Sequence, residues 1–182
     1  MTDYQPALAS ESYRDVPVFD HFDIIVLGGG PAGIAAATTA AKAGHSVLLI
    51  ERLGFCGGAA VSGMSGTICG LYKTVADPYE AQPQQIIFGF AERMRSALEA
   101  ERGLTAPQVY GKTWVTTHDC AKYKKVATDI LRGAGVQILY HTEMVDVITD
   151  GDSLKGLVLH TRSGFAQVFG KRVIDASGDA DA

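Results

Sequence analysis

The sequence predicts an α/β fold built around a parallel sheet. Residues 23–52 run through a short apolar segment, a glycine-rich turn, an alanine-rich segment and a second apolar segment. A helix-then-strand pattern returns over residues 119–140, and three strand-like runs follow it, separated by turn residues. Strands that alternate with helices form parallel sheets, whereas strands joined by short turns form a meander. Together these patterns predict a Rossmann-like α/β domain with an added β-meander.

The glycine-rich turn follows a strand predicted over residues 24–27. Gly28, Gly30 and Gly33 have the spacing GxGxxG. The first glycine permits a tight turn, the second lets a pyrophosphate approach the backbone, and the third lets the helix pack against the strand. Pro31 suits the first turn of a helix, where a missing amide proton costs nothing. The remaining amides of that turn, with Ala32 among them, are expected to face the phosphates of a ligand.

An acidic residue lies at the end of the second strand, where the dinucleotide-binding pattern has one. The helix continues over residues 35–42, a turn at Ala43-Gly44 follows, and residues 46–50 form the second strand. Glu51 lies at the end of that strand, where its carboxylate can accept hydrogen bonds from both hydroxyls of an unphosphorylated ribose. The alternative is that Glu51 only caps a neighbouring turn. The register of strand, glycines, helix and acid favours a dinucleotide-binding unit over a glycine turn that binds nothing.

Two further motifs carry a family resemblance. Residues 51–60 read ERLGFCGGAA, and residues 172–181 read RVIDASGDAD. In this order they resemble the FAD-dependent oxidoreductases of the glutathione-reductase-like superfamily. The resemblance covers residues 22–182 and implies a three-layer FAD-binding domain in which the meander covers one face of the parallel sheet. It also implies that FAD is the cofactor and that a hydride passes to it from a small organic substrate.

The resemblance extends the set of expected cofactor contacts. In the family, the glycines that match Gly57 and Gly58 run beside the pyrophosphate and ribityl chain of FAD, and the turn that matches residues 175–181 passes against the flavin. The resemblance also implies that the strand beginning at residue 143 lies beside adenine. We expect that strand to contact adenine through main-chain groups. The residues expected to hold FAD are Gly28, Gly30, Pro31, Ala32, Gly33, Glu51, Arg52, Gly57, Gly58, Ala59, Ser62, Met144, Val145, Ser177, Gly178 and Asp179.

The elements between these motifs follow from periodicity and turn residues. Residues 59–85 show no clear period and are expected to form a long excursion over the cofactor. Apolar residues at helical spacing predict a helix over residues 86–100, and a second helix is expected over residues 119–132. Strands are expected over residues 112–116, 136–140, 143–148, 154–161, 165–169 and 172–175, with turns at residues 150–152 and 163–164.

Few side chains are candidates for chemistry, because a bound flavin carries out hydride transfer itself and the protein needs no obligatory catalytic group. Cys56 precedes the paired glycines, and Cys69 lies in the excursion; each is either a reactive thiol or a small packing residue. His118 precedes a helix and is either an acid–base group or a solvated loop residue. The five histidines lack the spacing of a metal site, so no metal is expected.

Composition narrows the class of protein. Of the 182 residues, 47% are hydrophobic and 20% are charged, which suits a globular domain with its own core. A net charge of −4 argues against nucleic acid or an anionic membrane as the main partner. There is no apolar run long enough to span a membrane, and residues 1–20 lack the pattern of an export signal. Three cysteines without metal-type spacing suit a reducing compartment, so we expect a cytoplasmic location.

The organisation of the chain suggests that more polypeptide completes the site. Residues 1–20 are expected to form an arm, and residues 21–182 the FAD-binding domain. In the family that the sequence resembles, the chain continues past the late turn into a substrate-binding domain, which is absent from this sequence. We expect a second polypeptide, or the remaining half of the same precursor, to complete the active site. The alternative function is a non-catalytic, nucleotide-binding or assembly subunit of a flavoprotein complex.

Overall fold

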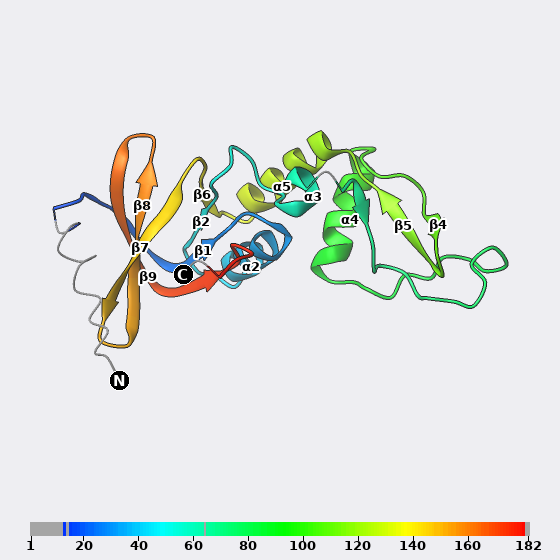
Figure 1. The fold of residues 1–182 in the computed structure, drawn as a ribbon, viewed down its shortest axis with the longest axis horizontal. Helices are drawn as coiled ribbons and strands as arrows, with labels where there is room; N and C mark the ends of the chain where they lie inside the picture. The colour runs from blue at the N-terminus through cyan, green and yellow to red at the C-terminus, as the bar shows by residue number, and fades with distance from the viewer. Residues whose placement is uncertain (1–12, 14, 64, 181–182) are drawn as a thin grey trace. The chain divides into compact units, whose positions relative to one another are not determined.

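A computed structural model describes residues 13, 15–63 and 65–180. The chain forms two compact units (Figure 1). The first unit comprises Met1–Cys56 and Leu131–Ala182, and the second comprises Gly57–Ile130. The residues of the domain expected over 21–182 fall in both units, and that domain stays a prediction. Most of the expected N-terminal arm lies outside the described residues, but its last three positions belong to the first strand, which begins at Val18.

The first unit contains a six-stranded sheet in the order β6-β2-β1-β9-β8-β7. Neighbouring strands are parallel from β6 to β9 and antiparallel from β9 to β7. The strands are β1 (Val18–Leu27), β2 (Val47–Ile50), β6 (Gln137–Leu139), β7 (Glu143–Asp150), β8 (Ser153–Thr161) and β9 (Gly164–Asp175). The parallel sheet and the meander are therefore joined through β9.

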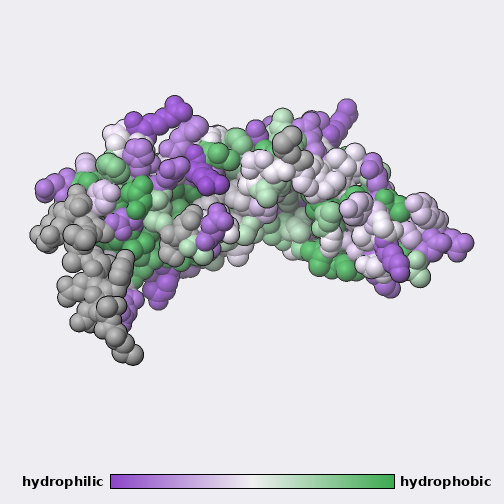
Figure 2. All heavy atoms as spheres, in the orientation of Figure 1, coloured by the Kyte–Doolittle hydropathy of each residue, from purple (hydrophilic) through white to green (hydrophobic). Residues whose placement is uncertain are grey.

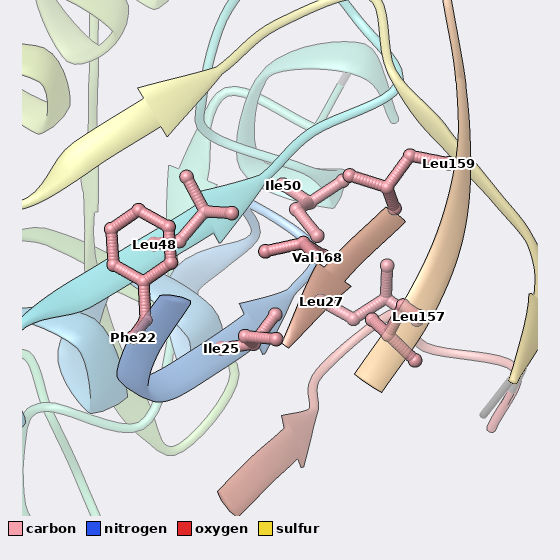
Figure 3. Packing of buried hydrophobic residues seen from close by; sticks show 8 residues of the cluster. All are labelled: Phe22, Ile25, Leu27, Leu48, Ile50, Leu157, Leu159 and Val168. Atoms are coloured by element: carbon pink, nitrogen blue, oxygen red, sulfur yellow. The ribbon is translucent and has the colours of Figure 1, made fainter. Parts of the chain in front are cut away.

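The parallel part of the sheet lies between a helix and the meander, as the three-layer fold predicts. Helix α2 (Pro31–Lys42) buries Ile34 and Ala37 and contacts β1, β2 and β9. The opposite face carries an apolar cluster in which side chains of the parallel strands pack against those of the meander (Figure 3). Its buried members are Phe22, Ile25, Leu27, Leu48, Ile50, Leu157, Leu159 and Val168. Alternation along β1 directs Ile25 and Leu27 to this face, and alternation along β2 directs Leu48 and Ile50 to it.

One strand differs from the sequence prediction. Separate strands were expected over residues 165–169 and 172–175, but β9 runs without a break from Gly164 to Asp175. The strand is continuous because β1 is also long and pairs with it from Val18 to Leu27. At Gly170 a side chain would meet Ile25, since a Cβ atom built there would lie 2.8 Å from Ile25 Cδ1. Gly170 therefore serves close packing within the sheet and does not end the strand.

The second unit contains three helical segments and a small antiparallel sheet in the order β3-β5-β4. Its elements are α3 (Ala59–Ser62), β3 (Thr67–Ile68), α4 (Phe90–Ala100), β4 (Gln108–Tyr110), β5 (Thr113–Thr117) and α5 (Cys120–Gly133), of which α5 continues into the first unit. Leu71, Tyr72 and Trp114 form a small buried cluster. The expected excursion over residues 59–85 therefore includes one helical turn and a short strand.

Helix α4 begins four residues later than predicted. Gly89 precedes it with φ +70, a left-handed conformation that does not continue a helix toward the N-terminus. Ile86, Ile87 and Phe88 consequently lie outside the helix and are among the exposed large apolar residues.

On the face drawn in Figure 2, hydrophobic residues are interspersed with hydrophilic ones. Within the described residues, no helix is long and apolar enough to cross a membrane.

Candidate cofactor site

The glycine-rich turn leads directly from β1 into α2. Gly28 has φ +97, and its N–H donates to Ile50 O at 2.8 Å. A Cβ atom on Gly33 would overlap Gly28 O, so this glycine allows α2 to approach the strand, as expected. A Cβ atom on Gly28 would overlap Ala176 O and lie 3.0 Å from Ser177 Cα. The first glycine therefore also brings the turn and the end of β9 together, a contact that the motif alone does not indicate.

The N-terminus of α2 suits an anion. Gly30 is the N-cap with φ −72, no side chain caps the helix, and its first turn contains no acidic residue. Pro31 and Ala32 are exposed. The first-turn amides of a helix have no acceptor within the helix, and the helix dipole favours negative charge at this end. Because any residue can adopt the φ of Gly30, glycine is required there only if a ligand approaches the backbone closely.

Glu51 is buried, with 6% of its surface exposed, and it already accepts two hydrogen bonds. Its Oε2 accepts from the N–H of Gly29 at 2.8 Å, and its Oε1 accepts from the N–H of Leu53 at 2.7 Å. The acid thus caps both adjoining turns, which is the alternative that the sequence left open. A carboxylate has about four acceptor positions, so two remain for ribose hydroxyls. Ribose binding by Glu51 stays a prediction.

Cys56 packs against the same turn and has no exposed surface. A Cβ atom on Gly29 would lie 2.7 Å from Cys56 Sγ, so the thiol occupies the space beside this glycine. Burial raises the pKa of the Cys56 thiol to about 11; the nearby charge of Glu51 also raises it, and a hydrogen bond with Tyr140 opposes the shift. A protonated, buried thiol is a poor nucleophile. These observations favour the packing role for Cys56.

The start of β7 lies beside Glu51. Thr142 N–H donates to Glu51 O at 3.2 Å, and Glu51 N–H donates to Leu139 O at 2.8 Å. In β7, Met144 pairs with Leu159 and Asp146 with Val158, which leaves Val145 as the extra residue of a bulge. Met144 packs on the apolar cluster, whereas the side chain of Val145 is 42% exposed. The expected adenine contact through the main chain of this segment stays a prediction.

The turn after β9 is held by its own side chains. Asp175 Oδ1 accepts from the Ser177 N–H at 2.9 Å and from the Ser177 hydroxyl at 2.7 Å. Ala176 N–H donates to Leu27 O at 2.8 Å, which ties the turn to the end of β1. Gly178 has φ +99, and both Gly178 and Asp179 are exposed. The last motif and the first motif therefore meet at the carboxyl end of the parallel sheet, where open α/β folds bind ligands.

Four expected contact residues lie in the second unit. Gly57 and Gly58 have φ +140 and +47 and lead into α3, which begins at Ala59. The Ser62 hydroxyl donates to Gly58 O at 2.7 Å, so it is engaged within α3. A Cβ atom on Gly57 would overlap Val61 Cγ2. The conformation of this turn requires glycine, while its contact with FAD stays a prediction, as does that of Arg52, whose side chain is exposed in the first unit.

The other two candidates for chemistry also lie in the second unit. Cys69 is exposed, and its Sγ is 4.0 Å from Thr67 Oγ1. His118 is 5% exposed, and its Nε2 lies 2.7 Å from Ala60 O. A solvated loop position for His118 was the alternative to an acid–base role, and its burial contradicts that alternative. Among the described residues, no group of histidine, cysteine and acidic side chains could hold a metal ion.

Sequence reasoning missed three contributors to this site. Gly29 donates to Glu51, Leu53 does the same from the following turn, and Thr142 ties β7 to the acid. The only signal in the sequence was the middle glycine of the run 28–30, at position 29, which the GxGxxG pattern does not require. Gly29 and Leu53 donate to the Glu51 carboxylate through backbone N–H groups, which every residue except proline has, so the residue type does not indicate this role.

The fold and the site define a dinucleotide-binding module in which a helix N-terminus, a strand-end acid and a late glycine turn meet. Comparison with known proteins places this module in a family. The chain belongs to the FAD dependent oxidoreductase family, whose model matches residues 23–182. FAD is accordingly its cofactor.

Individual relatives agree with this assignment. The chain is 25% identical over 206 residues to the NADH:fumarate oxidoreductase of Klebsiella pneumoniae (strain 342), a match that covers 97% of this chain and 22% of that protein. It is 30% identical over 164 residues to the dihydrolipoyl dehydrogenase of Zymomonas mobilis subsp. mobilis, covering 87% of this chain and 30% of that protein. The chain thus spans less than a third of the length of either relative.

Solved structures share the fold. The open conformation of a flavocytochrome c3 fumarate reductase aligns with a TM-score of 0.60 at 15% identity, over 96% of this chain and 36% of that one. The residues of the first unit fit the adenosine and pyrophosphate part of FAD. The α2 N-terminus has no side-chain cap and no acid in its first turn, and the buried Glu51 retains free acceptor positions.

Proposed function

We propose that this chain binds FAD for an oxidoreductase that transfers a hydride from a small organic substrate to the flavin. The observation that carries the proposal is the meeting of three segments at Gly28: the end of β1, the uncapped start of α2 and the turn after β9. When bound, the isoalloxazine ring of FAD supplies the hydride chemistry. The chain itself binds and orients the cofactor.

Each group has a distinct proposed task. The amides of Ala32 and Gly33 at the start of α2 bind the pyrophosphate, since this end of the helix carries partial positive charge. Glu51 accepts the hydroxyls of the adenosine ribose with its remaining acceptor positions. The main chain at Met144 and Val145 lies against adenine, and the Ser177–Asp179 turn and the Gly57–Gly58 turn follow the flavin half of FAD.

The test of this proposal is FAD binding by a Glu51→Ala variant. The change removes two charge-assisted hydrogen bonds to ribose, each worth roughly 1.5 to 3 kcal/mol when buried, so retention of FAD should be lost at micromolar concentration. Binding is measured by flavin fluorescence and titration calorimetry. The exposed residue Glu80 provides a matched control, and Glu80→Ala should bind FAD as the wild-type protein does. Unchanged affinity in Glu51→Ala would contradict the assignment.

Because Glu51 also caps two turns, the same experiment needs a readout of folding. Far-UV circular dichroism and thermal melting without FAD separate a folded variant with weak affinity from an unfolded one. Gly30→Val supplies a second test, because it adds side-chain atoms where the pyrophosphate is proposed to lie while Glu51 keeps its two hydrogen bonds. A folded Gly30→Val protein that binds FAD normally would also contradict the proposal.

We further propose that a second polypeptide, or the remaining half of the same precursor, completes the substrate site in the cytoplasm. The much greater length of the relatives supports an additional part, and the three free cysteines suit a reducing compartment. Size measurement on native material, with mass spectrometry of every component, tests the assembly. An active, flavin-loaded monomer of 19.3 kDa would refute it.

A second candidate function is a non-catalytic, nucleotide-binding or assembly subunit of a flavoprotein complex. The buried Cys56 with its raised pKa is compatible with this function, but it does not favour it, because flavin chemistry requires no protein thiol. Anaerobic absorbance spectra distinguish the two functions. Bleaching of the bound flavin on addition of a reduced donor supports the oxidoreductase, whereas a flavin that no donor reduces in the native assembly supports the structural subunit.

A further inference from the structure

We propose that His118 is a positioning residue for FAD, which acts by fixing the backbone of the Gly57–Gly58 turn in the second unit. The inference rests on the proposed function, in which that turn contacts the cofactor. His118 does not itself touch FAD in this scheme. It holds the short helix α3, and α3 in turn holds the two glycines that precede it.

The contacts of His118 reach both ends of the segment after the glycines. Its ring Nε2 lies 2.7 Å from Ala60 O in α3, and its backbone N–H donates to Gly66 O at 2.7 Å. A carbonyl oxygen only accepts, so Nε2 must carry the proton and donate it. Ala60 and Gly66 are therefore both bonded to His118, which follows β5: Ala60 through the side chain and Gly66 through the main chain.

The turn depends on such anchors because local structure alone cannot hold it. Gly57 and Gly58 adopt φ values of +140 and +47, and α3 contains only four residues and has no side-chain cap. Helices this short are unstable by themselves. Val61 packs over Gly57, and Tyr123 lies 3.4 Å from the position that a Gly57 Cβ would occupy. The His118 side chain adds a directional bond to this packing.

The environment of the ring argues against a role in packing alone. The imidazole is 5% exposed and lies against Tyr123, with ring centroids 5.0 Å apart. Its Nδ1 is buried and has no hydrogen-bond partner among the residues that the structure describes. A buried acceptor without a donor is unfavourable, so an apolar side chain of the same shape would fill the space better. The advantage of histidine at this position is the Nε2–H donor to Ala60.

The first test compares two amide substitutions that differ in reach. The amide nitrogen of His118→Gln is four bonds from Cα, as Nε2 is, and can donate to Ala60 O. The amide nitrogen of His118→Asn is one bond shorter and cannot. Loss of one neutral hydrogen bond predicts about two- to twelvefold faster amide exchange at residues 60–63 in the FAD-free His118→Asn protein. In His118→Gln the exchange should return to the slower wild-type rate.

The same variants are then titrated with FAD. A turn that is only partly in the binding-competent conformation lowers the apparent affinity in proportion, so His118→Asn should bind FAD about two- to twelvefold more weakly and His118→Gln about as well as wild type. Equal exchange and equal affinity in the wild-type and Asn proteins would overturn the inference. Equal losses in both variants would also overturn it, because they would indicate packing alone.

A measurement on the unaltered protein keeps the inference testable even if a variant fails to fold. Long-range proton–nitrogen NMR correlation of the imidazole should show the Nε2–H tautomer of His118, and the Nδ1–H tautomer would overturn the inference. The proposed function fails separately, when the wild-type protein does not bind FAD. In that case the exchange experiment still decides whether His118 holds the turn.

Discussion

Substitution of Gly29 by alanine tests how the centre of the cofactor site is packed. Gly29 does not adopt a left-handed conformation, so its backbone alone does not require glycine. A Cβ atom there would lie 2.7 Å from Cys56 Sγ and 2.8 Å from Glu51 Oε2, closer than real Cβ atoms approach such neighbours. The first unit must therefore move the thiol, the carboxylate or the turn to admit one methyl group.

The magnitude follows from these two contacts. Overpacking a well-packed site destabilises a protein by about 1 to 3 kcal/mol. A displaced carboxylate also weakens the bond from Gly29 N–H to Glu51 Oε2, now 2.8 Å long, and bonds to charged groups contribute about 1.5 to 3 kcal/mol. We expect Gly29→Ala to lower the free energy of unfolding by about 2 to 5 kcal/mol and to weaken FAD binding as well.

A double-mutant cycle locates the source of the strain. Cys56→Ala alone should destabilise by about 1 kcal/mol, as removal of one buried methyl group does. Combined with Gly29→Ala, it removes the closer of the two clashes, so the two changes together should destabilise by about 1 kcal/mol less than their sum. A matched control is Gly133→Ala, at a glycine with open space around it and no left-handed φ, which should be neutral or slightly stabilising.

The assay is urea unfolding followed by far-UV circular dichroism. The only tryptophan, Trp114, lies in the second unit, so its fluorescence reports on that unit and serves as an internal comparison. Two results would refute the reasoning. One is a Gly29→Ala protein as stable as the Gly133→Ala control, and the other is strict additivity of Gly29→Ala and Cys56→Ala.

Three further predictions concern single side chains. Val145→Ala should weaken FAD only slightly, because the proposed adenine contact uses the main chain, and a large loss in calorimetry would contradict that contact. In alkylation at pH 8 read by mass spectrometry, Cys69 should react while Cys56, with its pKa raised to about 11, stays protected until the protein unfolds; equal rates would be incompatible with the structure. A bidentate ion pair with Arg95 holds the pKa of Glu92 down to about 2. The stabilisation that this ion pair provides is therefore present above pH 5 and is lost as the pH falls toward 2. Arg95→Met should flatten this part of an acid-unfolding curve, and an unchanged curve would argue against the ion pair.

The parts of the site that lie close together in the sequence were predictable. Gly28 and Gly33 perform the tasks that the GxGxxG spacing assigns, because strand, turn and helix form one local unit whose geometry depends on few residues. The three layers were predictable for a similar reason. The continuous apolar runs in β1 and β2 require a cover on each face, and α2 and the meander provide it.

The contacts between distant segments were not predictable from residue patterns. The continuity of β9 through Gly170 depends on the length of β1, more than a hundred residues earlier in the chain. The late start of α4 depends on the left-handed conformation of Gly89, and glycine is compatible with many others. For His118 the sequence left an acid–base group and a solvated loop residue as alternatives, because nothing in its local sequence indicates that Ala60 O lies within hydrogen-bonding distance of Nε2.

Glu51 has one feature that the sequence predicts and one that only the structure shows. Its position at the end of β2 follows from periodicity, and that position in register with the glycines predicts a ribose contact. The structure adds that the carboxylate is held before any ligand arrives, by the amides of Gly29 and Leu53 on either side. A side chain that is already ordered loses little entropy on binding, so its remaining acceptor positions are preorganised for the ribose. Glu51→Ala should therefore lower the stability of the FAD-free protein as well as its affinity, whereas a substitution that acts only at the ligand, such as Gly30→Val, should lower affinity alone.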